Sequence, residues 1–325
     1  MSRVTISLVT YNGAEHLPLF LEGVQKQTFA DCQLVVCDNA STDATRELIE
    51  SHSPSARTIK KETNKGFAQG HNEIMLGTDS EYILVINQDT YLEKDYIALC
   101  VDFLDHHPKV ASVSGLCVRV HHLRDRDRAR KIDSAGISFR YNYFFEERLG
   151  NKPLVSIANP QEVFGVSGTA AFYRKSALEK VALVLNGKKE YLDADFFMYK
   201  EDVDLAFRLR WAGFTSYVVP AARVYHIRTG KKEAQRSNPF INYVSYRNTV
   251  AVWYKNLSAE LFLRFIASLL FFEMAKAIYC LIRERSTLCA WRDLMRLRPV
   301  LKEKRAMIMS SRKISSSAMV RALHL

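Results

Sequence analysis

Residues 4–51 read VTISLVTYNGAEHLPLFLEGVQKQTFADCQLVVCDNASTDATRELIES, and this stretch decides the fold class. It alternates short apolar, strand-like runs with amphipathic segments of helical spacing. The pairs are 4–9 with 14–27, 34–37 with 43–51 and, further along the chain, 82–86 with 94–106. Strands that alternate with helices predict an α/β protein with a mostly parallel central sheet that is covered on both faces.

Polar side chains follow each of these strands at the point where the strand ends. They are Thr10, Tyr11 and Asn12 after the first strand, Asp38 and Asn39 after the second, and Asn87, Gln88 and Asp89 after the strand at 82–86. In open α/β sheets, ligands bind beyond the carboxyl ends of the strands. We therefore expect these side chains to meet along one edge of the sheet and to line a binding site.

Residues 200–205 read KEDVDL and place three carboxylates at the start of a predicted helix. One interpretation is a well-capped helix, because acids there satisfy free N–H groups and the helix dipole. The other is an active site, since apolar and aromatic residues precede the run. Asp89 and His226, each at the end of a strand-like stretch, would then add metal and proton-transfer chemistry. Each also has a structural interpretation, as a turn aspartate and a structural histidine.

The composition limits the class of protein. A chain of 325 residues with 48% hydrophobic residues can bury a large core and exceeds the usual length of one domain. Its six cysteines show no CxxC spacing, which argues against a disulfide framework or a zinc cluster and favours a reducing compartment. No long apolar run precedes the first strand, so we expect the protein to stay in the cytosol or on a cytosolic membrane face.

The net charge of +11 suits nucleic acid, anionic lipid or a phosphorylated substrate. Much of the excess lies in residues 283–313, which hold ten basic and three acidic side chains. A nucleic-acid binder would interleave aromatic with basic residues on a stacking surface, and the apolar tail fits this poorly. Neither the G-x-G-x-x-G loop nor the G-x4-G-K-[ST] loop occurs, so nicotinamide and P-loop chemistry lose their main support.

The chain is expected to divide into a sheet-containing domain at 1–230 and a basic, amphipathic helical region at 231–325. Within the first, the alternating charges of 119–131 predict a solvated loop, with a binding site as the alternative. Sheet-like sequence resumes at 163–173, and a helix from Asp202 ends at a C′ glycine, Gly213. Residues 215–219 then predict a strand that leads through Pro220 toward His226.

Residues 257–283 are apolar, but Arg264, Glu273 and Lys276 interrupt them. A helix that spans a membrane needs about 20 predominantly apolar residues. Together with the basic residues that follow, the pattern indicates a helix lying in an anionic membrane surface. The alternative is a helical subdomain that packs on the rest of the chain or in a dimer.

Six motifs, in order, give the chain a resemblance to family 2 glycosyltransferases, and within them to the bacterial rhamnosyltransferase-like branch. The resemblance covers about residues 3 to 230, and the stretches Arg247-Asn248 and Tyr254-Lys255-Asn256 also look like the helical tail of that branch. The six motifs are residues 9–12 (VTYN), 36–43 (VCDNASTD), 64–67 (NKGF), 87–89 (NQD), 166–170 (VSGTA) and 201–205 (EDVDL).

The resemblance implies a GT-A fold and an inverting enzyme that moves a sugar from a dTDP-, UDP- or GDP-sugar to a hydroxyl group of a glycan, commonly a lipid-linked one. It implies that Asp202 is the catalytic base, which takes the proton of the attacking hydroxyl. It puts a divalent ion, Mn²⁺ or Mg²⁺, on Asp89 with help from His226. Glu201, Asp204 and Arg208 would support the base. The implied nucleotide-binding residues are Thr10, Tyr11, Asn12, Asp38, Asn64, Gly66 and Asn87.

One residue departs from the family pattern. The first acid of the D-x-D metal motif is an amide here, Asn87, so metal binding rests on Asp89. Asn87 is also the main argument for the alternative function, an inactive nucleotide-sugar-binding or scaffold protein of the same fold. The sequence names no donor sugar, acceptor, linkage or oligomeric state, and a homo-oligomer is left open. The tail is expected to hold the protein on the cytoplasmic face of the cell membrane.

Overall fold

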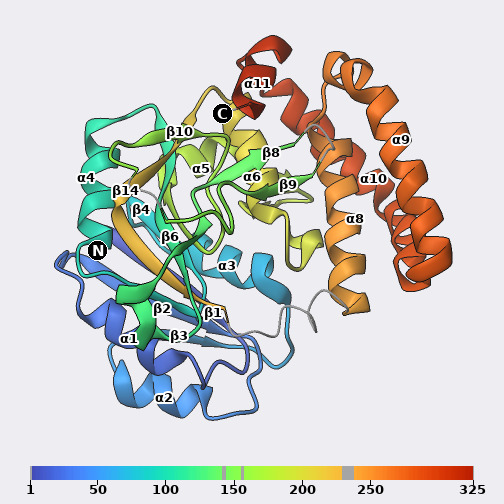
Figure 1. Ribbon diagram of the computed structural model, residues 1–325. Helices are drawn as coiled ribbons and strands as arrows, with labels where there is room; N and C mark the ends of the chain where they lie inside the picture. Colours follow the sequence, from blue (N-terminus) through green and yellow to red (C-terminus); the bar gives the residue numbers. More distant parts are fainter. Residues whose placement is uncertain (1, 141–143, 155–156, 229–237, 325) are drawn as a thin grey trace.

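The computed structural model describes residues 2–140, 144–154, 157–228 and 238–324. A central sheet lies between two layers of helices, and the C-terminal helices stack against one side of the molecule (Figure 1). The strand order is β10-β14-β6-β11-β4-β1-β2-β3. These strands are β1 (Val4–Thr10), β2 (Cys32–Asp38), β3 (Arg57–Lys60), β4 (Tyr82–Ile86), β6 (Val110–Val120), β10 (Gln161–Val163), β11 (Ala170–Arg174) and β14 (Thr215–Ile227).

The sheet is mostly parallel, as the sequence predicts. β1 pairs in parallel with β2 and β4, β2 with β3, and β6 with β14, whereas β10 and β11 run against their neighbours. The short strands β5 (Thr90–Leu92) and β7 (Lys131–Ser134) extend the sheet beside β14 and β6. Two hairpins lie off the sheet, β8 (Ile137–Phe139) with β9 (Phe145–Glu147), and β12 (Leu183–Leu185) with β13 (Lys188–Glu190).

Successive side chains of the buried strands pack against helices on opposite faces of the sheet, because side chains alternate in direction along a strand. In β4, Leu84 packs in the cluster that contains α1, α2 and α4, while Ile83 and Val85 pack with α3, α5 and α6. The helices of the two layers are α1 (Leu17–Gln25), α2 (Thr45–His52), α3 (Gly66–Leu76), α4 (Tyr96–His106), α5 (Lys175–Val181) and α6 (Glu201–Trp211).

Two segments differ from their sequence-based expectations. The segment at 119–131 is not a solvated loop throughout, because Arg119 belongs to β6 and donates a hydrogen bond to the buried carboxylate of Asp133 at 2.8 Å. A 3-10 helix, η1 (Leu123–Arg128), follows it. The strand expected near 215–219 continues to Ile227, since Pro220 falls at a shift in the register between β14 and β6, where no ladder hydrogen bond is lost.

The C-terminal helices pack directly on the sheet-containing part of the chain. Trp253 and Leu257 share one hydrophobic cluster with Phe164, Phe207 and Trp211. The expected domain boundary at 230/231 lies outside the described residues, and the two-domain division stays a prediction. The helices are α8 (Pro239–Asn256), α9 (Ala259–Arg283), α10 (Cys289–Ser310) and α11 (Ser316–Leu323), with two further 3-10 turns, η2 (Ala194–Phe196) and η3 (Arg285–Leu288).

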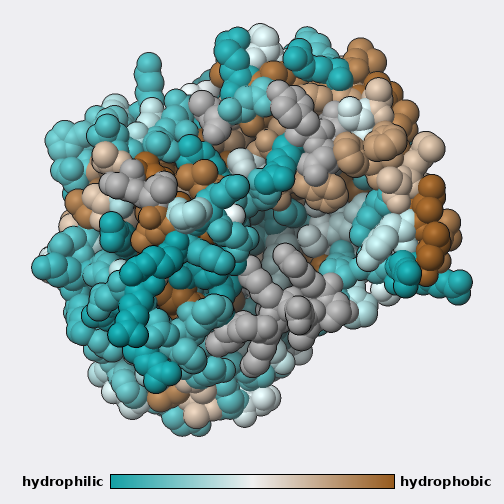
Figure 2. Space-filling model, viewed as in Figure 1, coloured by the Kyte–Doolittle hydropathy of each residue, from teal (hydrophilic) through white to brown (hydrophobic). Residues whose placement is uncertain are grey.

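Helix α9 carries an exposed apolar face along the outer edge of the molecule. Figure 2 shows hydrophobic residues gathered at the edge where α9 lies in Figure 1. Among the residues with large exposed fractions are Leu263, Leu270, Phe271, Met274, Ile278 and Ile282. By length and composition alone, α9 could cross a membrane, because its few charges leave a long enough apolar window. This differs from the sequence-based expectation of an interrupted helix.

Candidate active site

A cavity of about 580 Å³ lies beside the carboxyl end of β4 and the start of α6. The residues that the sequence predicts for chemistry and metal binding line it together, although they come from three distant parts of the chain. Asn87 and Asp89 follow β4, Glu201 and Asp202 open α6, and His226 lies near the end of β14.

Asp202 faces this cavity from the first turn of α6. Its Oδ2 atom accepts a hydrogen bond from the backbone N–H of Gly168 at 3.0 Å, and its Oδ1 atom accepts one from the N–H of Val203 at 2.8 Å. The two bonds fix the direction of the carboxylate while it stays on the cavity wall. An aspartate held in this way can accept a proton from a hydroxyl group that enters the cavity.

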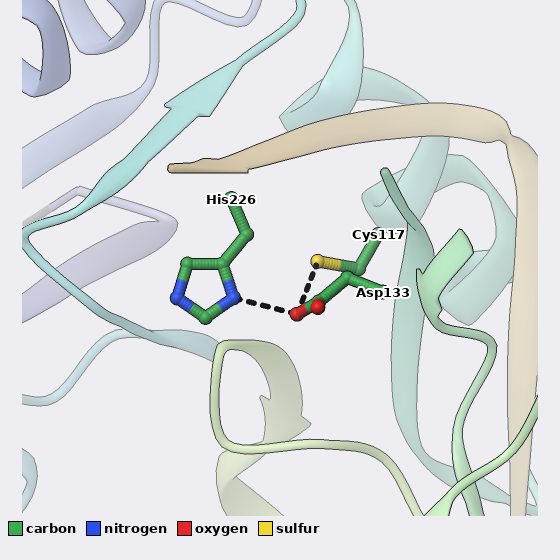
Figure 3. A group of neighbouring side chains, drawn as sticks. All are labelled: Cys117, Asp133 and His226. Atoms are coloured by element: carbon green, nitrogen blue, oxygen red, sulfur yellow. Dashed lines mark hydrogen bonds and ion pairs between the residues drawn. The ribbon is translucent and has the colours of Figure 1, made fainter. Parts of the chain in front are cut away.

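Asp89 and His226 form a pair that lines the same cavity. The Nε2 atom of His226 lies 3.1 Å from Oδ2 of Asp89, and its Nδ1 atom lies 2.7 Å from Oδ2 of Asp133. Figure 3 shows Asp133 on one side of the imidazole, with the other ring nitrogen turned away from it. Burial lowers the pKa of His226, but the two carboxylates outweigh burial and raise this pKa well above its ordinary value.

These residues fit a divalent ion. The Oδ1 atom of Asp89 is buried and has no hydrogen-bond partner among the described residues. A carboxylate beside an imidazole nitrogen is a donor set that suits Mn²⁺, and the imidazole must be neutral to bind it. Asp133 would act as the outer partner that orients the ring, an arrangement common in metal sites.

Cys117, Asp133 and His226 also approach one another, with ligand atoms within 4.8 Å (Figure 3). The carboxylate of Asp133 already accepts hydrogen bonds from Arg119 and Arg228. Burial would raise the pKa of Asp133, but bonds to His226 and the charge of Arg228 hold it well below its usual range. Burial raises the pKa of the Cys117 thiol to about 11. A protonated thiol and two guanidinium groups disfavour a second ion here.

Of the residues expected around the nucleotide, Asn87 lines this cavity, whereas Thr10, Tyr11, Asn12, Asp38, Asn64 and Gly66 do not. Gln88 lines the cavity and connects it to the residues after β1. Its Oε1 atom accepts hydrogen bonds from Thr10 Oγ1 at 2.5 Å and from the N–H of Tyr11 at 3.2 Å. Asn12 accepts a hydrogen bond from the N–H of Thr42 at 2.9 Å. The side chain of Asn64 accepts one from the N–H of Gly66 at 2.8 Å.

Asp38 is fully buried, and its oxygens bond to the N–H of Ser41 at 3.1 Å and to Nε of Arg46 at 2.5 Å. Its carboxylate therefore shapes the loop after β2, and its role toward a nucleotide stays a prediction. Asp204 and Arg208 likewise lie away from the cavity. They form an ion pair one turn apart, with Arg208 Nε 3.0 Å from Asp204 Oδ2, and both are buried.

The structure adds two residues to the cavity that sequence reasoning missed. Glu147, from β9, accepts a hydrogen bond from Ser167 Oγ at 3.0 Å, and its buried Oε2 atom has no partner among the described residues. Burial, and then the charge of Asp202, raise the pKa of Glu147 to about 7. Arg228 adds a guanidinium group to the cavity lining, and it donates to Asp133, the carboxylate that also contacts His226. Neither lies in a recognisable motif; the only signal was charge near irregular sequence.

The fold and the acidic cavity at its sheet edge are those of a nucleotide-sugar-dependent glycosyltransferase. The family described as Glycosyl transferase family 2 matches residues 5–182, more than half of the chain, and the protein therefore belongs to this family. It is also 27% identical over 249 residues to the N-acetylglucosaminyl-diphospho-decaprenol L-rhamnosyltransferase of Mycobacterium tuberculosis, covering 67% of this chain and 74% of that protein. The predicted family and its rhamnosyltransferase-like character are confirmed.

Solved structures agree on the fold. TarS 1–349 of S. aureus in complex with UDP-GlcNAc has a TM-score of 0.56 at 18% identity, covering 95% of this chain and 89% of that one. The mannosyltransferase PcManGT from Pyrobaculum calidifontis, in complex with GDP-Man and Mn²⁺, has a TM-score of 0.52 at 17% identity, covering 99% and 87%. At these identities the likeness extends to the fold alone, and it confirms the predicted GT-A class.

Proposed function

We propose that this glycosyltransferase moves a sugar, with inversion, from a nucleoside-diphosphate donor to a hydroxyl group of a lipid-linked or cell-surface glycan. The observation that carries the proposal is the cavity that Asp202 lines together with the pair Asp89 and His226. The M. tuberculosis relative, whose name specifies a lipid-diphosphate acceptor, supports the acceptor class. Nucleotide-sugar complexes of TarS and PcManGT support the donor class.

In the proposed reaction, Asp202 accepts the proton of the acceptor hydroxyl while the hydroxyl oxygen forms a bond to the anomeric carbon. The bond from that carbon to the donor phosphate breaks, and the nucleoside diphosphate leaves with the electron pair. A divalent ion held by Asp89 and His226 would stabilise the charge on this leaving group as a Lewis acid. Arg228 offers a second positive charge from the same cavity.

The base assignment is tested with Asp202→Asn. The amide keeps the shape and the bond from Gly168 but cannot accept the proton, so we expect transfer to fall by at least about 100-fold. Binding of the donor and of Mn²⁺ should change little, as measured by calorimetry after a panel of UDP-, dTDP- and GDP-sugars has identified the donor. Near-normal turnover by this variant would remove Asp202 from the role. A wild-type chain that binds donor but never transfers or hydrolyses it would favour the inactive alternative.

We further propose that α9 docks on the anionic cytoplasmic face of the cell membrane. Two of its charged residues are paired within the structure: Glu273 accepts a hydrogen bond from Tyr246, and Lys276 pairs with Glu284 at 2.9 Å. The apolar residues Phe271 and Ile278 are 66% and 56% exposed. Because the basic segment at 283–313 follows directly, anionic head groups would complement it.

Vesicle co-sedimentation of the full chain tests the docking. We expect binding to phosphatidylglycerol-containing vesicles, weaker binding at high salt, and little binding to pure phosphatidylcholine. Phe271→Ser with Ile278→Ser should weaken binding, while Val184→Ser, at an exposed apolar position away from α9, should not. Equal binding by the double variant and the wild type would contradict docking through α9.

A further inference from the structure

The segment that leads into α6 has an unusual backbone. Phe197, Tyr199 and Lys200 have φ angles of 64°, 68° and 73°, a region that residues other than glycine seldom adopt. We call residues 197–200 the hook. The hook ends one residue before Glu201, and Asp202 follows, so its shape sets the direction from which the proposed base enters the cavity. Since no glycine relieves these angles, contacts from elsewhere must hold them.

Asn248, on α8, supplies such contacts. Its side chain is fully buried, and Nδ2 lies 2.8 Å from the carbonyl oxygen of Phe196, 2.9 Å from that of Met198 and 2.8 Å from that of Tyr199. An amide NH₂ group has two hydrogens, so one of them is shared between two carbonyls. One side chain thereby donates to three carbonyl groups of the backbone, and the Phe196 oxygen also accepts from the N–H of Met198 at 2.7 Å.

Arg247, the preceding residue, orients this amide. Its Nε and Nη2 atoms donate to Oδ1 of Asn248 at 3.0 and 2.9 Å, so the amide nitrogen must face the hook. Nη2 also donates to the carbonyl oxygen of Asp195 at 2.8 Å. A guanidinium group can only donate hydrogen bonds. Arg247 therefore donates to Asn248, and Asn248 in turn donates to backbone oxygens of the hook.

Helix α8 also contacts the first turn of α6. Lys255 Nζ and Asn256 Nδ2 each lie 2.8 Å from Oδ1 of Asp204, in the first turn of α6. On its other side, the hook touches the start of α3, where the N–H of Ala68 donates to the carbonyl oxygen of Phe197 at 3.2 Å. Helix α8 thus holds the backbone before Asp202 and the side chain two residues after it.

We propose that Arg247 and Asn248 are positioning residues of the transferase, which hold the hook so that Asp202 faces the acceptor. Neither lines the cavity, so they act through the hook and not on the substrate. The inference rests on the proposed role of Asp202. It assigns to α8 the function of positioning the catalytic base.

The test uses the full chain with Asn248→Asp, which keeps the size of the side chain but presents oxygen to three carbonyl oxygens. We expect amide hydrogen exchange in peptides covering 196–204 to become faster, with exchange elsewhere unchanged. Turnover should fall by about 10- to 100-fold. The KM for donor, and binding of whichever of UDP, GDP or dTDP stabilises the wild type most, should change by less than about twofold, because nucleotide-side contacts are untouched.

Thr249→Val is the matched control, because among the described residues the hydroxyl of Thr249 bonds within its own helix, to the carbonyl of Ser245 at 2.8 Å. Arg247→Met serves if the aspartate variant does not fold, and Arg247→Lys should restore part of the turnover. Unchanged exchange in the hook, or faster exchange with unchanged turnover, would overturn the proposal. The proposed function would be overturned by a wild type that has no transferase activity. If Asn248→Asp still changed amide hydrogen exchange in peptides covering 196–204, the contact between Asn248 and the hook would nevertheless be confirmed.

Discussion

Glu201 is a buried carboxyl group next to the proposed base, and its Oε2 atom has no hydrogen-bond partner among the described residues. Burial, and then the negative charge of Asp202, raise the pKa of Glu201 to about 8 from an ordinary value of 4.5. The native chain therefore keeps this proton at neutral pH, whereas the unfolded chain loses it. A carboxyl group that stays protonated beside the proposed base adds no second negative charge there.

This difference makes the free energy of unfolding depend on pH. Because the folded-state pKa is raised, the contribution is complete below about pH 4.5 and is lost as pH rises through about 8. Each pKa unit corresponds to about 1.4 kcal/mol, so the loss amounts to a few kcal/mol. We expect Glu201→Gln to remove most of this loss, as measured by urea unfolding at pH 6 and pH 9. The measured quantity is the difference in the free energy of unfolding between the wild type and Glu201→Gln. The same difference at pH 9 and at pH 6 would contradict a protonated Glu201 in the folded chain.

At the scale of elements, α3 and the hook meet through Gly66. Its φ angle is +84°, and a Cβ atom there would lie 2.4 Å from the carbonyl oxygen of Phe197. Gly66→Ala should therefore lower the free energy of unfolding by about 2 to 4 kcal/mol, through both backbone strain and displacement of the hook. Gly187→Ala is the control, because Gly187 has a φ of +74° but nothing within 4 Å of the added atom. Urea unfolding should show a larger decrease in the free energy of unfolding for Gly66→Ala than for Gly187→Ala. Equal decreases would mean that the hook moves away from the added Cβ atom without destabilising the fold.

The elements that repeat a simple pattern are the ones the sequence predicts. Tyr82–Ile86 forms a strand with the expected bounds, since five apolar residues between polar turns suit a buried strand. The contacts that complete the site escape such reasoning, because they join residues far apart. Asp133 meets His226 across 93 residues, and Glu147 lies in a segment without clear period. Resemblance pointed to Arg247 and Asn248 without giving them a role, since only the folded chain brings α8 to the hook.

At the scale of the whole molecule, buried charges join the C-terminal helices to the sheet-containing part. Asp193 is fully buried and pairs with Lys255 of α8 and, at 2.5 Å, with Lys304 of α10. Lys304 also reaches Glu190 at 2.7 Å and Asp195 at 2.9 Å. Breaking one member of a buried pair is costly, because it leaves the other charge without compensation in a poorly solvated site. The shared hydrophobic cluster of Trp211 and Trp253 binds the same two parts.

Lys304→Met should therefore destabilise the entire chain and not α10 alone. We expect the free energy of unfolding to fall by about 3 kcal/mol, while Lys302→Met, at an exposed position on the same helix, changes it by less than about 0.5 kcal/mol. Differential scanning calorimetry should show one transition for the wild type, which moves as a unit in Lys304→Met. Two transitions, of which only the smaller moves, would mean that the helical region unfolds independently of the part that carries Asp89 and Asp202. In that case α8 would leave the hook before the sheet melts, and activity should disappear at the lower transition.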